Sequence, residues 1–159
     1  MNKSEIRKKI LKIRKQKSSI NLNINYEDIL KILKKNKIKD KLVGGYHPYN
    51  HEVDAMKILQ KLERKGYQIS LPKIKKNFQM NFFNWSKNEP LKINKYGIPE
   101  PISANVVYPD ILLIPLSAFD NRLYRIGYGG GYYDRYIKKI KKRKKIITIG
   151  LAYSFQRVK

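Results

Sequence analysis

A near-continuous apolar run, "DILLIPLSAF" at residues 110–119, limits the folds open to this chain more than any other feature. Central strands of parallel sheets read as unbroken apolar runs because both of their faces are buried, whereas strands with one wet face alternate. A second run of this kind, "KIITIGLAYS", occupies residues 145–154. The segment between the two runs carries apolar residues at helical spacing, namely Tyr133, Tyr136, Ile137 and Ile140. A helix between two buried strands predicts the parallel sheet of an α/β protein.

The rest of the chain continues this alternation of helices and strands. Apolar spacing predicts helices over residues 3–16 and 27–37, and a third helix with Asn50 as its N-cap that ends at Gly66. Short strands are expected in "KLVGGYHP", "YQISLPKI" and "FQMNFFNW", and the proline-rich residues 86–108 are expected to form a long connecting loop. These elements predict an open three-layer α/β/α sandwich, Rossmann-like, with a mostly parallel sheet, in a single domain of residues 1–159.

The composition restricts the chemistry and the partners. The chain has no cysteine, which excludes disulfides, cysteine zinc sites and thiol nucleophiles. Its net charge of +24 fits a nucleic-acid partner, faster capture of a small anionic substrate, or compositional drift toward Lys, Ile, Asn and Tyr. No run approaches the roughly 18 apolar residues of a membrane span, and the first residues lack the apolar segment of a signal peptide. We therefore expect a cytoplasmic protein that does not associate with membranes.

A glycine cluster, "RIGYGGGYYDRY" at residues 125–136, follows the first apolar run and precedes the predicted helix. The first turn of a helix has unpaired N–H groups and the positive end of the dipole, and both attract phosphate. The cluster does not match the Walker loop, and the dinucleotide pattern fails because position 132 is tyrosine. The sequence predicts a phosphate-binding loop of another kind, and a purely structural turn is the alternative.

Two charged residues flank the cluster. Asp134, in the first turn of the helix, is placed to hold Mg²⁺ at nucleotide oxygens, or else to stabilise the helix dipole alone. Arg125, just before the cluster, is placed to neutralise charge on a phosphoryl group. The Mg²⁺ interpretation of Asp134 and the position of Arg125 point to phosphate chemistry at this loop, whereas the dipole interpretation of Asp134 does not.

The stretch "FDNRLYRIGYGGGYYDRYI" closely resembles the signature of the 5-formyltetrahydrofolate cyclo-ligase family, with Ile126 where the family has leucine. Further segments resemble the family in the same order along the chain: "KSEIR", "YHPYNHEVDAMKIL", "SLPKI", "MNFFNW", "YGIPEP" and "TIGLAYSFQRV". The resemblance implies an enzyme that converts 5-formyltetrahydrofolate to 5,10-methenyltetrahydrofolate with ATP and Mg²⁺ and releases ADP and phosphate. It also implies small-molecule partners, and we expect a monomer.

The resemblance also assigns site residues. ATP would be bound by two segments: Lys3, Ser4, Glu5, Ile6 and Arg7, and Arg125, Ile126, Gly127, Tyr128, Gly129, Gly130, Gly131, Tyr132 and Tyr133. Folate would be bound by His47, Glu52, Tyr128, Gly129, Gly130, Gly131 and Tyr132. Arg125, Tyr128 and Tyr132 would be catalytic, and Asp134 would be a metal ligand.

Other interpretations of these residues stay open. Lys3 and Arg7 are also typical charges of a basic helix, Glu52 is also a first-turn dipole partner, and His47 is also a solvated loop residue. Two alternatives to the enzyme remain as well: a shortened homologue of low activity that binds nucleotide or folate, and a basic nucleic-acid-binding protein on the same fold.

The chain departs from the family pattern at two points. Leu123 stands where the family usually has a glycine, in the turn before Arg125. The family also continues beyond the position of Lys159 with a His-Asp pair, whose aspartate serves Mg²⁺, and a final strand. We therefore expect a C-terminally shortened domain that lacks the second Mg²⁺ ligand.

Overall fold

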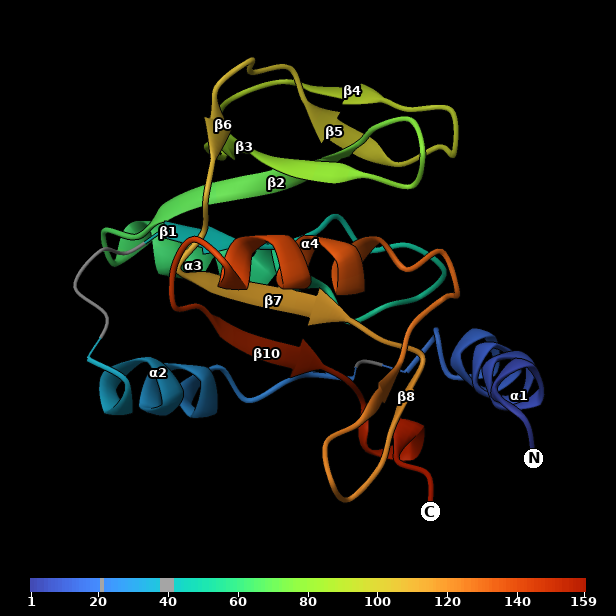
Figure 1. The fold of residues 1–159 in the computed structure, drawn as a ribbon. Helices are drawn as coiled ribbons and strands as arrows, with labels where there is room; N and C mark the ends of the chain where they lie inside the picture. Colours follow the sequence, from blue (N-terminus) through green and yellow to red (C-terminus); the bar gives the residue numbers. More distant parts are fainter. Residues whose placement is uncertain (21, 38–41) are drawn as a thin grey trace.

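A mixed six-stranded sheet forms the centre of the computed structural model, which describes residues 1–20, 22–37 and 42–159 (Figure 1). Four neighbouring strands are parallel, and two further strands add antiparallel at one edge. In spatial order they are β10 (Ile147–Leu151), β7 (Ile111–Pro115), β1 (Leu42–Gly44), β2 (Gln68–Ile74), β3 (Met80–Trp85) and β6 (Val106–Val107). The predicted α/β fold with a mostly parallel sheet is confirmed.

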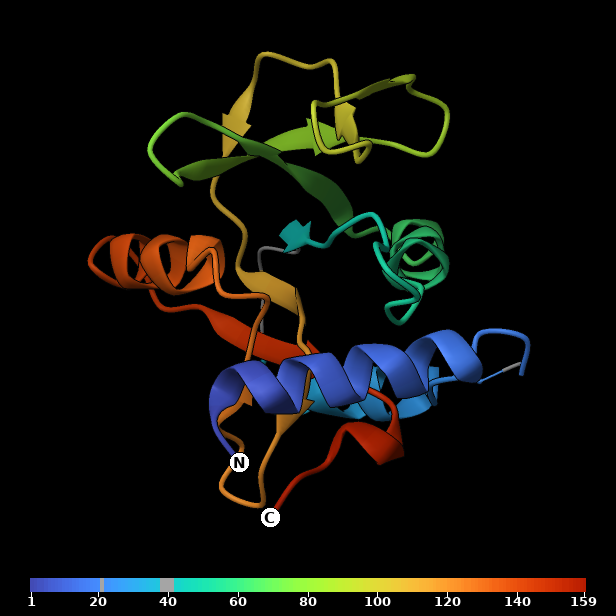
Figure 2. The ribbon, with the colours of Figure 1, turned by 90° about the vertical axis from the view of Figure 1, so that its right-hand side faces the viewer.

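Helices cover both faces of this sheet. Apolar side chains of α2 (Tyr26–Lys35) and α3 (Ala55–Arg64) belong to one buried cluster, and those of α4 (Tyr132–Lys141) belong to another. Figure 2 shows α3 and α4 on opposite sides of the strands. The remaining helix, α1 (Lys3–Gln16), lies beyond the edge toward which the arrowheads of β7 and β10 point (Figure 1). Within the described residues, no helix combines the length and apolarity that crossing a membrane requires.

The burial of strand β7 on both faces explains why its apolar and polar residues do not alternate. Ile111 and Leu113 belong to the cluster beneath α2 and α3, whereas Leu112 and Ile114 belong to the cluster beneath α4. Successive side chains of a strand point to opposite faces, so a strand covered on both sides must be apolar throughout. The strand is shorter than the apolar run, however. It ends at Pro115, and β8 (Ala118–Phe119) turns away to pair with β9 (Arg125–Ile126).

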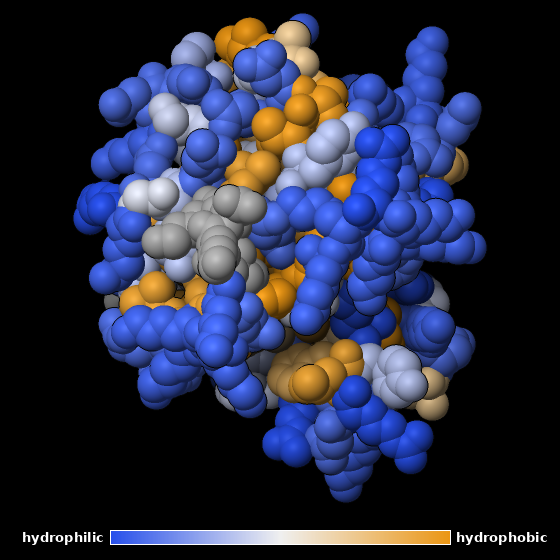
Figure 3. Space-filling view, turned by 60° about the vertical axis from the view of Figure 1, so that its left-hand side comes forward, coloured by the Kyte–Doolittle hydropathy of each residue, from blue (hydrophilic) through white to orange (hydrophobic). Residues whose placement is uncertain are grey.

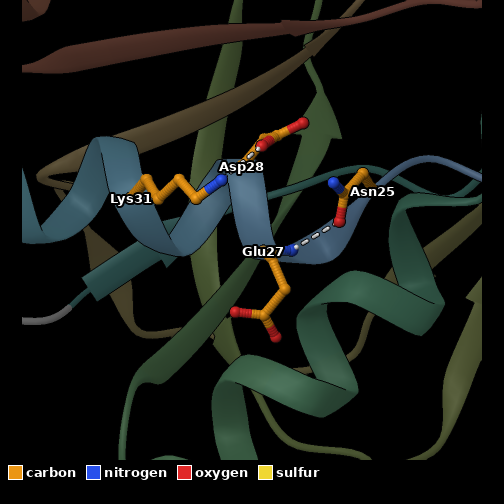
Figure 4. A network of polar contacts seen from close by, with 4 residues as sticks. All are labelled: Asn25, Glu27, Asp28 and Lys31. Atoms are coloured by element: carbon orange, nitrogen blue, oxygen red, sulfur yellow. Dashed lines mark hydrogen bonds and ion pairs between the residues drawn. The ribbon is translucent and has the colours of Figure 1, made fainter.

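The start of α2 shows how local side chains set a helix boundary. The Asn25 side chain accepts a hydrogen bond from the Glu27 N–H at 3.1 Å, and Asp28 pairs with Lys31 at 3.3 Å (Figure 4). The cap satisfies one of the unpaired N–H groups of the first turn. The helix therefore begins at Tyr26, one residue before the predicted start.

The prediction that Asn50 caps the third helix is wrong. Asp54 is the cap, because its carboxylate accepts hydrogen bonds from the N–H groups of Met56 at 3.0 Å and Lys57 at 3.4 Å. Asn50 instead lies in a turn, where it and His51 have φ values of 48° and 57°. Asparagine tolerates this left-handed conformation better than most residues, so the same chemistry that favours caps also favours this turn.

The prediction that residues 86–108 form a structureless loop is also wrong. They contain a hairpin of β4 (Leu91–Ile93) and β5 (Pro99–Pro101), followed by the edge strand β6. The Asn94 side chain closes the hairpin turn by accepting hydrogen bonds from the N–H groups of Tyr96 at 2.9 Å and Ile98 at 3.1 Å. Prolines are tolerated in such a strand because a two-stranded hairpin leaves some N–H positions unpaired.

Leu123 strains the turn between β8 and β9. Its φ is 64° and its side chain is 82% exposed, so nothing offsets the clash of its Cβ with the backbone.

We expect Leu123→Gly to raise the free energy of unfolding by about 0.5–1 kcal/mol, because glycine accepts positive φ without that clash. Urea unfolding measures the change. Leu123→Ala is the matched control, since it keeps Cβ, and equal stability of the Gly and Ala variants would contradict the explanation.

Candidate active site

A pocket of about 510 Å³ opens at the carboxyl ends of the parallel strands. Its walls come from α1, the loop after β1, the β4–β5 hairpin and the segment from Arg125 to Asp134. Tyr46 follows β1, and Pro115 ends β7, so the pocket occupies the edge at which open α/β sheets bind ligands. The structure thereby brings together predicted residues that are more than 100 positions apart in the sequence.

The glycine loop ends in an open helix N-terminus. Gly131 is the N-cap of α4 with φ 67°, and no side chain caps this end. Gly129 has φ 105°, and a Cβ at this position would lie 3.6 Å from Cζ of Arg7. Arg7 also donates from Nε to the Gly127 carbonyl at 2.7 Å. The loop therefore presents backbone N–H groups and a guanidinium to one space, which is an arrangement that binds anions.

Cations surround this loop. Lys3, Arg7 and Arg125 line the pocket, while Arg135 lies outside and donates to the carbonyls of Phe78 and Gly130. Figure 3 shows one face of the molecule largely covered by hydrophilic side chains. The chain has 36 Lys and Arg residues, far more than those that line the pocket, so basic residues are not confined to it. Their convergence on the glycine loop still favours a small anionic ligand there, because a concave site focuses the field of its charges.

Asp134 lies at the mouth of the pocket in the first turn of α4, where the sequence predicted it. Its side chain is 76% exposed and forms an ion pair with Arg125, whose side chain is only 20% exposed. The carboxylate is therefore accessible from solvent and adjacent to the loop. This position suits both a helix-dipole partner and a ligand for a metal ion that arrives with a phosphate.

Glu52 is held in the pocket wall by the turn that precedes it. It is 9% exposed and accepts a hydrogen bond from the Tyr49 N–H at 2.8 Å, while its own N–H donates to the Tyr49 carbonyl at 3.1 Å. Two consecutive residues of this turn, Asn50 and His51, have positive φ. Non-glycine residues in that conformation are costly and gather at functional sites, so the strained turn itself marks Glu52.

Burial raises the pKa of Glu52 to about 7, against the opposing effects of the Tyr49 N–H, Arg14 and Tyr128. Desolvation disfavours the charged form of a carboxyl group, whereas donors and positive charges favour it. The group therefore changes its protonation close to neutral pH. Carboxylates tuned in this way are typical of binding and catalytic sites.

Two tyrosines of the loop face the same space. The Tyr128 hydroxyl accepts a hydrogen bond from Nη1 of Arg14 at 2.5 Å, and burial raises the pKa of Tyr128. The Tyr133 hydroxyl is buried and has no hydrogen-bond partner within the described part of the chain. Buried polar groups are normally satisfied, so this unpaired hydroxyl is an unusual feature of a residue in the pocket wall.

Other predicted residues take different places. His47 and Tyr132 line the pocket, whereas Ser4, Glu5 and Ile6 are not among its lining residues. Glu5 closes a capping box with Asn2, accepting from the Asn2 N–H at 2.9 Å. These three residues lie in the same helical turn as Lys3 and Arg7, but their roles remain predictions.

Sequence reasoning missed the hairpin wall and one buried cation. Tyr96 and Glu100 of the hairpin line the pocket, and Glu100 accepts from the Ile74 N–H at 3.0 Å, which fixes the hairpin to β2. Arg14 of α1 is buried behind Tyr128. Its signal was its spacing, because Arg7, Ile10 and Arg14 occur at i, i+3 and i+7 and so share one helix face.

The fold and the pocket define an α/β protein with a cation-lined pocket at the carboxyl edge of its parallel strands. The chain belongs to the 5-formyltetrahydrofolate cyclo-ligase family, which matches residues 1–159. It is 29% identical to the 5-formyltetrahydrofolate cyclo-ligase of Haemophilus influenzae, over 98% of this chain and 88% of the relative.

Two solved structures share the fold. The 5,10-methenyltetrahydrofolate synthetase of Aquifex aeolicus matches with a TM-score of 0.71 and 34% identity, over 99% of this chain and 80% of that chain. The synthetase of Mycoplasma pneumoniae matches with a TM-score of 0.70 and 25% identity, over 100% of this chain and 90% of that chain. The family resemblance that the glycine loop indicated is therefore confirmed, and it extends over the whole chain.

Proposed function

We propose that this protein converts 5-formyltetrahydrofolate to 5,10-methenyltetrahydrofolate and couples the conversion to hydrolysis of ATP to ADP and phosphate. The family and its named relatives support this reaction. The observation that carries it is the convergence of Glu52, the glycine loop and the α1 cations on one pocket. These are the groups that a folate and a polyphosphate require side by side.

The glycine loop and α1 would bind the phosphates of ATP. The open N-terminus of α4 supplies N–H donors, and Lys3, Arg7 and Arg125 supply positive charge. Arg7 is already hydrogen-bonded to the loop, so it is more than a solvated charge of a basic helix. In the reaction the formyl oxygen takes the γ-phosphoryl group, N10 attacks the formyl carbon, and phosphate leaves with that oxygen. Fixed donors at the transferred group would stabilise its charge.

Asp134 fits a magnesium ion that is bound together with ATP. Mg²⁺ commonly uses one or two carboxylates and takes its other ligands from phosphates and water. In the described ranges 1–20, 22–37 and 42–159, no group of three His, Cys, Asp or Glu side chains could hold a metal ion. The exposed carboxylate of Asp134, beside the glycine loop, would supply one carboxylate ligand, and the phosphates of ATP and water would have to supply the others. Bound there, the ion would neutralise charge on the phosphate oxygens.

Glu52 would bind the pterin ring. The amide and amino edge of a pterin carries N–H donors, and an ionised carboxylate is an acceptor for both. Apolar and aromatic residues of the hairpin and of β3 complete the pocket, including Tyr96, Ile98 and Met80. This combination of an apolar wall and a few fixed polar groups is typical of small-molecule sites.

The proposal is tested by following the absorbance of methenyltetrahydrofolate as it forms from 5-formyltetrahydrofolate. We expect product only when ATP and Mg²⁺ are both present. Lack of ATP-dependent product from folded protein would overturn the reaction. Binding of ATP or folate without turnover would favour the low-activity homologue.

We expect Asp134→Asn to raise the KM for Mg·ATP about tenfold or more and to cost less than about 1 kcal/mol of stability. The amide keeps the shape of the side chain but loses the charge that binds the metal. Asp28→Asn is the matched control, because Asp28 occupies the same third position of α2 and does not line the pocket. Equal effects of the two changes on stability, with no effect of either on KM, would leave only the helix-dipole role.

A further inference from the structure

Arg14 is a buried cation that joins four segments of the site. It is 2% exposed, and its Nη1 donates to the Tyr128 hydroxyl at 2.5 Å and to the Asn50 carbonyl at 3.3 Å. Its Nη2 donates to the Leu116 carbonyl at 3.1 Å. The guanidinium thus ties α1 to the glycine loop, to the turn that carries Glu52 and to the segment after β7.

This arrangement is costly for a residue with only a packing role. Among the described residues, no carboxylate forms an ion pair with Arg14. Its hydrogen-bond acceptors are two carbonyls and a hydroxyl, so the full charge is buried without a counter-ion in contact. Burying such a charge normally costs more than an apolar replacement of equal volume. The cost suggests that the charge serves the groups around it.

We propose that Arg14 is a positioning residue of the active site, which fixes the Tyr128 hydroxyl in the pocket wall and keeps the Glu52 carboxylate ready to bind the substrate. The inference rests on the proposed function, in which Glu52 and Tyr128 contact the folate.

The electrostatics around Glu52 agree with this role. The groups that act on its carboxyl are the Tyr49 N–H, Arg14 of α1 and Tyr128 of the glycine loop, and it in turn acts on Tyr46 and on Tyr133 of α4. Burial raises the pKa of all three tyrosines, so they are neutral near pH 7. Among these groups, Arg14 supplies the positive charge, and it lowers the pKa of Glu52 against the effect of burial.

Arg14 also lines a second cavity, which has a volume of about 780 Å³. Glu52 lines both this cavity and the active-site pocket, whereas Arg14 and Lys17 line only the second one. Arg14 can therefore be approached from the cavity that the proposed reaction does not use. A small cation can enter there if the side chain is shortened.

The experiment compares Arg14→Met, Arg14→Lys, Arg14→Ala and Tyr128→Phe with the unmodified protein. We expect Arg14→Met to lower kcat/KM for 5-formyltetrahydrofolate about tenfold to a hundredfold, the effect of losing charge-assisted hydrogen bonds, with little change in the KM for ATP. The rising limb of its pH profile should move to higher pH, because Glu52 loses the nearby positive charge. Arg14→Lys keeps that charge, so its rising limb should stay close to that of the unmodified protein. Tyr128→Phe loses only the smaller pKa-lowering effect of the Tyr128 hydroxyl, so its rising limb should move to higher pH by less than that of Arg14→Met. Guanidinium ion, at concentrations far below those that unfold proteins, should restore part of the activity of Arg14→Ala.

Lys17→Met is the control, because Lys17 lines the same second cavity from the end of the same helix. The proposal would be overturned if Arg14→Met left the pH profile unchanged. It would also be overturned if Arg14→Met raised the KM for ATP as much as the KM for 5-formyltetrahydrofolate. The titration of Glu52 is also followed directly by NMR of the labelled carboxyl carbon. If the unmodified protein has no turnover, the proposed function fails, and the NMR titration still decides whether Arg14 controls Glu52.

Discussion

Replacing Arg125 by methionine is expected to lower kcat/KM for ATP-dependent cyclisation by roughly 10²–10³-fold. The Arg125 side chain is largely buried beside the glycine loop, and it pairs with Asp134 at the start of α4. A guanidinium in this place stabilises charge that develops on the transferred phosphoryl group, and methionine supplies no charge there. Because the interaction strengthens in the transition state, kcat should fall more than the KM for ATP rises. Steady-state kinetics with each substrate in turn measure both quantities.

Two further variants make this result specific. Arg125→Lys keeps the positive charge but loses the planar guanidinium, so its activity should lie between that of the unmodified protein and that of Arg125→Met. Arg122→Met is the control, because Arg122 is exposed in the β8–β9 connection just before Arg125 and does not line the pocket. A comparable loss of activity in both Met variants would mean that the net charge, and not Arg125 itself, drives turnover.

The sequence predicted the centre of the molecule better than its edges. The strands β7 and β10, the helix α4 and the glycine loop between them were predicted because burial on both faces and helical spacing leave clear patterns. The β4–β5 hairpin was missed because its strands are three residues each and β5 begins and ends with proline. Short edge strands bury little apolar surface and therefore leave little pattern in a sequence.

The candidate site was also predicted only in part. Glycine spacing predicted a phosphate-binding loop, the family resemblance indicated Glu52, and the structure places Glu52 in one pocket with that loop. Arg14 was not predicted, because a basic residue in a helix rich in lysine is expected to be solvated. Its burial depends on segments 36 to 114 positions away, at Asn50, Leu116 and Tyr128. The spacing within the helix indicates which face Arg14 shares, but these long-range contacts are set by the tertiary fold.

Glu52→Gln is expected to make the protein more stable at alkaline pH and to remove its activity. Burial raises the folded-state pKa of Glu52 from 4.5 to about 7, so the folded protein binds this proton more tightly than the unfolded chain does. The free energy of unfolding should therefore fall as the pH rises from about 4.5 to about 7, by up to about 3 kcal/mol, and the contribution should stay constant at higher pH. The Glu52→Gln variant has no proton to lose at this position, so relative to the unmodified protein it should gain up to that amount between about pH 4 and pH 8. Urea unfolding at a series of pH values measures the difference.

The activity of the same variant separates structure from function. A glutamine can still accept the Tyr49 N–H, so the turn should survive, but it cannot offer two charged acceptors to the donors of a pterin edge. Glu27→Gln is the control, because Glu27 is exposed in the first turn of α2 and its carboxylate contacts none of the residues drawn with it (Figure 4). We expect that control to keep both the pH dependence of stability and the turnover of the unmodified protein. A Glu52→Gln variant that is stabilised at alkaline pH yet fully active would show that Glu52 is a buried structural acid, whereas gain of stability with loss of turnover identifies a group whose burial is retained because the substrate needs its charge.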